Sequence, residues 1–157
     1  MGRLAFYVIV LFCGIPGSGK TTIATLLAER LARVGRVELL SSDNLRAPVY
    51  KKIFRAIAAD RDPADVLILD ATFFKKELRR EVKSRARSEK VLTIYLDCPL
   101  EVALERNRSR QPNISEKALH IMFRCMEPPR HPTLRIETAT TTADDAAGKI
   151  YACIEND

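Results

Sequence analysis

The chain has 157 residues, of which 46% are hydrophobic and 29% are charged, with only 6 Gly and 8 Pro. A chain of this length buries about 70% of its unfolded surface, which is enough for one core. This composition excludes a disordered or fibrous chain. We therefore expect one globular domain over residues 1–157.

The charge balance favours an anionic ligand. There are 26 Lys and Arg against 20 Asp and Glu, a net charge of +6, which suits nucleotides, phosphates or RNA. The four cysteines are far apart in the sequence and include no Cys-x-x-Cys pair, so a zinc site is disfavoured and reduced thiols are expected. The longest apolar run, residues 4–13, is half of the roughly 20 residues that a membrane helix needs. We expect a cytoplasmic protein with no membrane segment.

Strands and helices are predicted to alternate along the chain. Residues 4–13 are rich in aromatic and β-branched side chains without alternation, which is typical of a central parallel strand. Apolar positions at helical spacing run from Lys20 to Val34, and Gly35 ends that helix. Later strands are expected at 37–41, 66–69, 91–97 and 134–138, and later helices at 44–59, 75–88, 100–109, 115–126 and 142–154, with Ser115 and Thr142 as N-caps.

This order predicts an α/β fold, a three-layer sandwich with a five-stranded, mostly parallel sheet. Ligands of such sheets bind beyond the carboxyl ends of the strands. The residues that directly follow each strand are therefore the first candidates for a functional site.

The segment after the first strand fits the pattern Gly-x-x-x-x-Gly-Lys-Thr in full and leads directly into a helix. Loop amides and a helix N-terminus together bind phosphate groups. Lys20 is predicted to reach the β- and γ-phosphates of ATP, and the Thr21 hydroxyl to bind Mg²⁺. The predicted nucleotide-binding residues are Gly14, Ile15, Pro16, Gly17, Ser18, Gly19, Lys20, Thr21 and Thr22.

Two acids follow the next strands. Asp70 ends a fully apolar strand and is predicted to support Mg²⁺, although it could instead cap a helix. Asp43 lies where a strand gives way to a predicted helix, so it is either an N-cap or a general base that accepts the proton of a substrate hydroxyl. Arg46 would share a helical face with Asp43 and either pair with it or bind an anionic substrate group.

Two further basic segments stand out. Arg106, Arg108 and Arg110 end a predicted helix, where they either favour the helix dipole or form a lid over residues 106–114 that closes on a triphosphate. In the lid, Arg106 and Arg110 would lie on one face and Arg108 on another. The basic helix 75–90 is either a solvated surface or a contact for an RNA backbone such as that of tRNA.

With the loop, the Asp-x-x-Arg stretch at 43–46, Asp70 and the Arg-Asn-x-x-Arg stretch at 106–110, the chain resembles the P-loop kinases that phosphorylate hydroxyl groups, in particular the kinase domain of O-phosphoseryl-tRNA kinase. The resemblance implies the fold of P-loop nucleoside triphosphate hydrolases, with ATP and Mg²⁺ as cofactors. It also implies that Asp43 activates the acceptor, that Arg46 supports it, and that Arg106 and Arg110 hold the triphosphate.

The acceptor stays open. The tRNA kinases carry a further helical domain that the 157 residues do not include, and Ala71 and Phe73 replace a second acid and an Asn. The Asp-Asn-x-Arg stretch at 43–46 also resembles adenylylsulfate kinase, but the Lys-Gly-Leu-Tyr stretch of that family is absent; polynucleotide kinases share the same loop. We expect an ATP-dependent kinase for a hydroxyl of a small molecule, an RNA or an aminoacyl-tRNA. The alternative is an ATP-dependent switch or assembly factor without phosphotransfer.

Overall fold

The computed structural model describes residues 8–58, 65–86 and 90–156, and these form a five-stranded sheet in which every neighbouring pair of strands is parallel. The predicted α/β fold is confirmed. The spatial order of the strands is β2-β3-β1-β4-β5. Their bounds are β1 Val8–Cys13, β2 Val37–Ser41, β3 Val66–Asp70, β4 Lys90–Asp97 and β5 Leu134–Glu137. Residues 4–7 of the predicted first strand lie outside the described residues.

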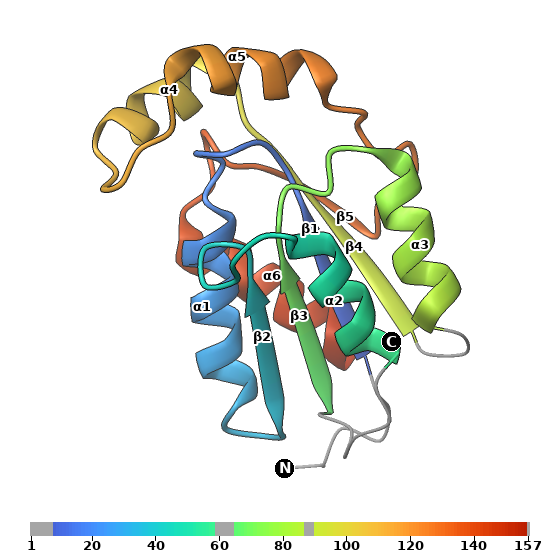
Figure 1. Ribbon diagram of the computed structural model, residues 1–157. Coiled ribbons are helices and arrows are strands. Elements are labelled where there is room, and N and C mark those ends of the chain that lie inside the picture. The colour runs from blue at the N-terminus through green and yellow to red at the C-terminus, as the bar shows by residue number, and fades with distance from the viewer. Residues whose placement is uncertain (1–7, 59–64, 87–89, 157) are drawn as a thin grey trace.

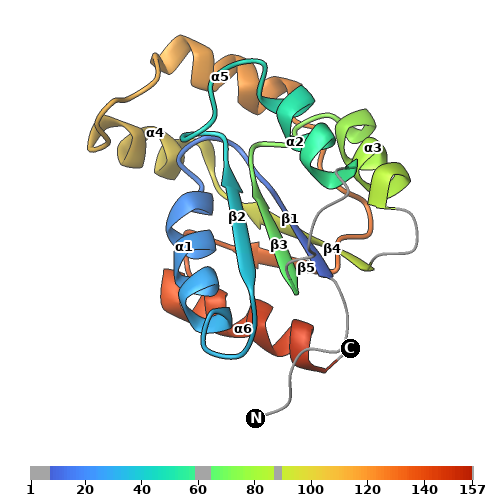
Figure 2. The same ribbon diagram turned by 60° about the horizontal axis from the view of Figure 1, so that its bottom comes forward.

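Six helices surround the sheet in the described part of the chain. They are α1 Lys20–Leu31, α2 Val49–Ala58, α3 Lys76–Ala86, α4 Leu100–Arg108, α5 Glu116–Cys125 and α6 Ala143–Glu155. Figures 1 and 2 show α1 and α6 on one face of the sheet and α2 and α3 on the other, which gives the predicted three layers. The remaining pair, α4 and α5, lies across the carboxyl ends of the strands. None of the helices in the described residues is long and apolar enough to span a membrane.

The central strand β1 is buried along its whole length, as its unbroken apolar sequence predicts. Val8, Val10 and Phe12 pack toward α1 and α6, while Ile9 and Leu11 pack toward α2 and α3. Each such side chain contributes about 1.5–3 kcal/mol through removal from water. The side chains of β1 are thus buried in two hydrophobic clusters, one on each face of the sheet. This burial fixes the register of β1 and therefore the position at which the glycine-rich loop begins.

Parallel pairing brings the ends of three strands to one edge. Ser41 at the end of β2 is in register with Asp70 at the end of β3, and the glycine-rich loop leaves β1 between β3 and β4. Side chains from three separate segments of the sequence therefore meet at this edge, as the fold class predicts.

The N-terminal boundary of the second predicted helix is wrong. Residues 42–44 form a turn, and α2 begins only at Val49. The reason is Pro48, because a proline disfavours helical backbone in the residue before it. The predicted N-caps are confirmed: the Ser115 hydroxyl accepts from the Ala118 N–H at 3.1 Å, and that of Thr142 accepts from the Asp145 N–H at 3.1 Å.

Candidate functional site

The glycine-rich loop needs its glycines. Gly17 and Gly19 have φ angles of +82° and +96°, in the left-handed region where a side chain is strained. A Cβ on Gly17 would also lie 2.6 Å from the backbone oxygen of Ala103 in α4. This loop is therefore in direct contact with the helix pair that covers the carboxyl end of the sheet.

Lys20 opens α1 and is almost fully buried. Its Nζ donates to the backbone oxygens of Gly14 at 2.7 Å and Ile15 at 2.8 Å. Burial lowers the pKa of Lys20 to about 8, and the nearby Asp70 carboxylate opposes this shift. The ammonium group is thus held inside the curve of the loop, where the glycine-rich motif predicts the phosphates.

Asp70 is buried at the end of β3, and its Oδ2 accepts two short hydrogen bonds. The donors are the Ser41 hydroxyl at 2.7 Å and the Thr21 hydroxyl at 2.8 Å. Mg²⁺ in kinase sites is held by one or two carboxylates, substrate phosphates and water. A hydroxyl beside one fixed carboxylate suits that ion. No group of three or more His, Cys, Asp or Glu residues suitable for a metal occurs within the described ranges.

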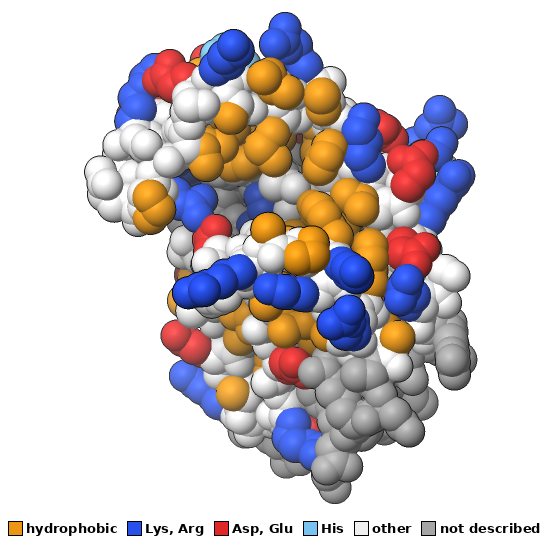
Figure 3. Space-filling view, viewed as in Figure 1, with side chains coloured by type: hydrophobic (Ala, Val, Ile, Leu, Met, Phe, Trp, Pro, Cys, Tyr) orange, Lys and Arg blue, Asp and Glu red, His pale blue; other side chains and the backbone are white. Residues whose placement is uncertain are grey.

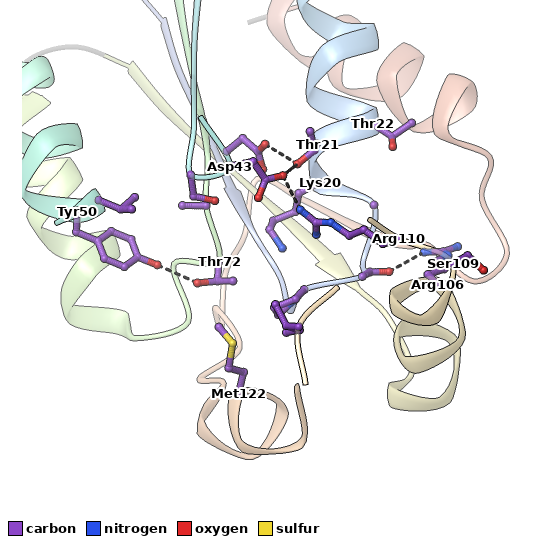
Figure 4. Close-up of a pocket in the computed structure, with 18 residues that line it drawn as sticks. Lys20, Thr21, Thr22, Asp43, Tyr50, Thr72, Arg106, Ser109, Arg110 and Met122 are labelled. Atoms are coloured by element: carbon purple, nitrogen blue, oxygen red, sulfur yellow. Dashed lines mark hydrogen bonds and ion pairs between the residues drawn. The ribbon is translucent and has the colours of Figure 1, made fainter. Parts of the chain in front are cut away.

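Asp43 lies in the turn after β2 and faces the same loop. Its Oδ2 is 3.2 Å from the Thr21 hydroxyl and accepts from Arg110 at 2.7 Å. The single Thr21 hydroxyl hydrogen serves one carboxylate at a time, and the distance to Asp70 is shorter. Figure 4 shows Thr21 and Arg110 both directed at Asp43, with Lys20 next to Thr21.

The three arginines around the end of α4 separate as predicted. Arg106 donates to the Thr138 oxygen at 2.8 Å and lies 3.3 Å from the Ser18 oxygen, whereas Arg108 pairs with Glu116 at 2.7 Å. Because α4 ends at Arg108, Arg110 lies in the turn beyond it rather than on a shared helical face with Arg106, so that detail of the prediction is wrong. Arg106 and Arg110 nevertheless both line the same cavity.

The segment between α4 and α5 is held by a buried asparagine. The Asn107 amide donates to the Ile114 oxygen at 2.7 Å, and its Oδ1 accepts from the Ile114 N–H at 3.1 Å. This pair of hydrogen bonds closes the loop that carries Arg110. The predicted lid segment, residues 106–114, comprises the end of α4 and the turn that these hydrogen bonds close.

Arg46 does not join the site. It is exposed, lies outside the cavity lining, and its backbone oxygen accepts from the Lys52 ammonium at 2.6 Å. The prediction that it shares a helical face with Asp43 is wrong, because the helix begins beyond both residues.

Arg79 is a second basic residue whose place differs from the prediction. It belongs to the basic helix 75–90, yet its guanidinium is buried and donates to the Phe73 oxygen at 2.6 Å and the Glu127 oxygen at 2.7 Å. Lys76, Arg80 and Lys83 of the same helix are exposed, whereas residues 87–89 lie outside the described part. Any RNA contact through this helix therefore excludes Arg79.

A cavity of about 720 Å³ joins these residues and extends beyond them. Figure 3 shows the hollow between α5 and the start of α2, with hydrophobic side chains gathered along its α5 side. Eight lining residues were not among the predicted site residues: Ser42, Val49, Tyr50, Ala71, Thr72, Ser109, Ile114 and Met122. Ser42, Ala71 and Thr72 follow the ends of strands and could have been found from that position. The other five depend on how the helices around the carboxyl end of the sheet pack.

Comparison with known families shows to which family the chain belongs. A family model described as chromatin associated protein KTI12 matches residues 8–148. The chain belongs to the KTI12 family. The similarity to solved structures agrees with this: Kti12 of Chaetomium thermophilum in complex with ADP-AlF3 has a TM-score of 0.72 at 19% identity, with 93% of this chain and 98% of that chain covered. At that identity the likeness concerns the fold.

The KTI12-family chain is also related to kinases. The adenylyl-sulfate kinase of Clostridium kluyveri is 30% identical over 166 residues, which cover 91% of this chain and 81% of that kinase. The human L-seryl-tRNA(Sec) kinase is 37% identical over 65 residues, which cover 40% of this chain but only 19% of that kinase. The resemblance to hydroxyl-phosphorylating P-loop kinases is confirmed. This member of the KTI12 family is thus a P-loop kinase-like or ATPase-like protein.

The buried ammonium group of Lys20 leads to a prediction on pH. A bound polyphosphate adds negative charge beside Lys20 and so raises its pKa above 8. Binding of ATP should then take up a proton above pH 8, and affinity should fall by at most about tenfold per pH unit as pH rises further. Calorimetry at pH 8.5 in two buffers of different ionisation enthalpy should give different heats, with a smaller difference at pH 7. Equal heats in the two buffers at pH 8.5 would contradict the placement of the Lys20 ammonium group beside the bound phosphates.

Proposed function

We propose that this protein is an ATP- and Mg²⁺-dependent phosphotransferase that moves the γ-phosphoryl group of ATP to a hydroxyl group. The observation that carries this proposal is the position of Asp43. Its carboxylate lies beside Thr21 of the glycine-rich loop and lines a cavity that continues past the loop toward α2 and α5. A second substrate therefore has room next to the expected position of the ATP phosphates. The Asp43 carboxylate would lie between the phosphates and this second substrate.

In the proposed reaction the acceptor oxygen attacks the γ-phosphorus, the bond from that phosphorus to the bridging oxygen of ADP breaks, and the hydroxyl proton passes to Asp43. Lys20 and the loop amides stabilise the charge on the phosphates, and Arg106 and Arg110 add to this field. Thr21 and Asp70 would hold Mg²⁺, which neutralises charge on the phosphate oxygens. Arg46, outside the cavity lining, is left with at most an indirect role.

The proposal is tested by transfer from ATP labelled at the γ-position. Seryl-tRNA, adenylylsulfate, nucleosides, free amino acids and 5′-hydroxyl RNA are offered in turn with Mg²⁺. A kinase labels one of these acceptor classes faster than it releases phosphate to water. Release of phosphate at one slow rate with every acceptor would contradict the proposal.

Slow release of phosphate at one rate, whichever acceptor is offered, would support an ATP-dependent switch or assembly factor. Membership in the KTI12 family, which is described as chromatin associated, favours this candidate, because a chromatin-associated protein contacts a partner. In a switch, ATP binding changes a surface that contacts a partner and hydrolysis resets it.

An RNA acceptor would add a contact along α3. The relationship to L-seryl-tRNA(Sec) kinase and the exposed Lys76, Arg80 and Lys83 support this contact. Reversing these three charges should weaken tRNA binding and flatten its dependence on salt, because each lost phosphate contact lowers the salt slope by about 0.9. Filter binding between 50 and 200 mM salt, roughly the range over which such contacts weaken strongly, measures the slope. An unchanged slope would remove α3 from the contact.

A further inference from the structure

The cavity has two unlike ends. At one end lie the glycine-rich loop and the three cations Lys20, Arg106 and Arg110. The far end is formed by α2, the segment after β3 and α5, and most of its lining is apolar. Its lining residues are Val49, Tyr50, Ala71, Thr72, Ile114 and Met122. No cationic side chain of the described residues lines this far end.

Two hydroxyl groups supply the polar part of the far end. The Tyr50 and Thr72 hydroxyls are 2.9 Å apart, and Figure 4 marks the contact between them. The Tyr50 oxygen also accepts from the Phe73 N–H at 3.0 Å. Two hydroxyls that share one hydrogen bond use one of their two hydrogens. The other O–H has no acceptor among the described residues and is available to a bound molecule.

The Tyr50 ring is held in place from two sides. Phe73 meets it edge-on with ring centroids 5.2 Å apart, and Phe54 lies 6.3 Å from it in a stacked arrangement. Phe73 itself has a φ of +43°, and the Tyr50 oxygen, Cys13 and Arg79 all bond to its backbone. Tyr50 therefore offers a fixed aromatic surface, which costs little ordering on binding.

The charges around the far end disfavour an anion. Asp43 and Asp70 both line the cavity next to it. Arg110 is paired with Asp43, and Lys20, Arg106 and Arg110 are the cations that the proposed function assigns to the ATP phosphates. With ATP bound, an anionic acceptor would therefore leave water for a site with two carboxylates nearby and no cation of its own among the lining residues of the far end.

We propose that the Tyr50–Thr72 end of the cavity is the acceptor subsite, and that it takes an uncharged hydroxyl compound with a planar or apolar body. This inference rests on the proposed function. The proposed acceptor is uncharged, whereas the adenylylsulfate named for the adenylyl-sulfate kinase relatives is anionic. Adenosine and adenylylsulfate form a matched pair of probes, since they share base and ribose and differ in the anionic group.

The test is calorimetry of each probe with the protein saturated by Mg²⁺ and AMPPNP, so that the nucleotide site is filled. Adenosine should bind at least tenfold more tightly than adenylylsulfate. Thr72→Val should weaken adenosine binding by roughly tenfold, the loss of one hydrogen bond, and leave AMPPNP binding unchanged. Tyr50→Leu should weaken it further. Thr25→Val, at a hydroxyl bonded to the α1 backbone outside the cavity lining, is the control and should change neither.

Thr72→Val keeps the shape of the side chain and is the decisive variant if Tyr50→Leu fails to fold. Equal or tighter binding of adenylylsulfate, no binding of either probe, or no effect of Thr72→Val would each overturn the subsite. In those cases AMPPNP binding would stand and the proposed function with it. If AMPPNP itself failed to bind, both the proposed function and the subsite would be overturned.

Discussion

Asp43→Asn should lower the rate of phosphoryl transfer by about 10²- to 10⁴-fold, the usual contribution of a general base. Asparagine keeps the shape of the side chain but accepts no proton from the acceptor hydroxyl. ATP affinity should stay close to that of the native protein, because Lys20 and the loop, which are expected to hold the phosphates, are unchanged. The two quantities are measured separately, by labelled-ATP transfer to the acceptor found in the screen and by calorimetry with ATP and Mg²⁺.

Asp144→Asn provides the matched control. Asp144 pairs with Arg30 at 2.6 Å at the start of α6 and does not line the cavity. This control should transfer phosphate at the native rate. Native turnover by Asp43→Asn would remove Asp43 from the mechanism, and loss of ATP binding would assign it to the nucleotide site instead.

Gly17→Ala should weaken both ATP binding and the fold. A left-handed backbone costs a residue with a Cβ about 1–2 kcal/mol, and the added methyl group would lie 2.6 Å from the Ala103 oxygen. Because that neighbour is helix backbone, either the loop or α4 must shift. We expect the melting temperature to fall by about 2–4 °C for each kcal/mol lost and ATP affinity to fall at least about tenfold, as displaced loop amides lose the phosphates.

Gly148→Ala is the corresponding control. Gly148 lies inside α6, and its added Cβ would meet the end of the flexible Arg30 side chain at 3.0 Å. Alanine favours a helix over glycine, so stability should stay equal or rise and ATP binding should not change. A Gly17→Ala protein as stable and as tight as native would show that the loop tolerates a side chain there.

The sequence predicts the strands and the loop well because both leave strong local signals. Apolar runs without alternation identify β1 and β3, and the glycine pattern identifies the loop between β1 and α1. The predicted start of α2 is wrong because the helical spacing of apolar residues continues through a segment that Pro48 keeps out of the helix. That error also misplaced Arg46.

The far end of the cavity could not be predicted because its residues are brought together by packing. Tyr50, Thr72 and Met122 come from α2, the segment after β3 and α5, and no local pattern links them. Arg79 was misassigned for a related reason. Its place in a basic helix suggests that its side chain is exposed. In the structure the guanidinium is buried and donates to the backbone oxygens of residues 73 and 127.

The two hydrogen bonds of Arg79 have a consequence for α5. One guanidinium joins the segment after β3 to the segment after α5, and the Glu127 N–H strengthens this junction by donating to the Phe74 oxygen at 2.8 Å. Arg79 does not line the cavity, yet its hydrogen bonds connect the segment that carries Thr72 to the end of α5, the helix that carries Met122. Two walls of the cavity are thus joined by a residue that lies outside it.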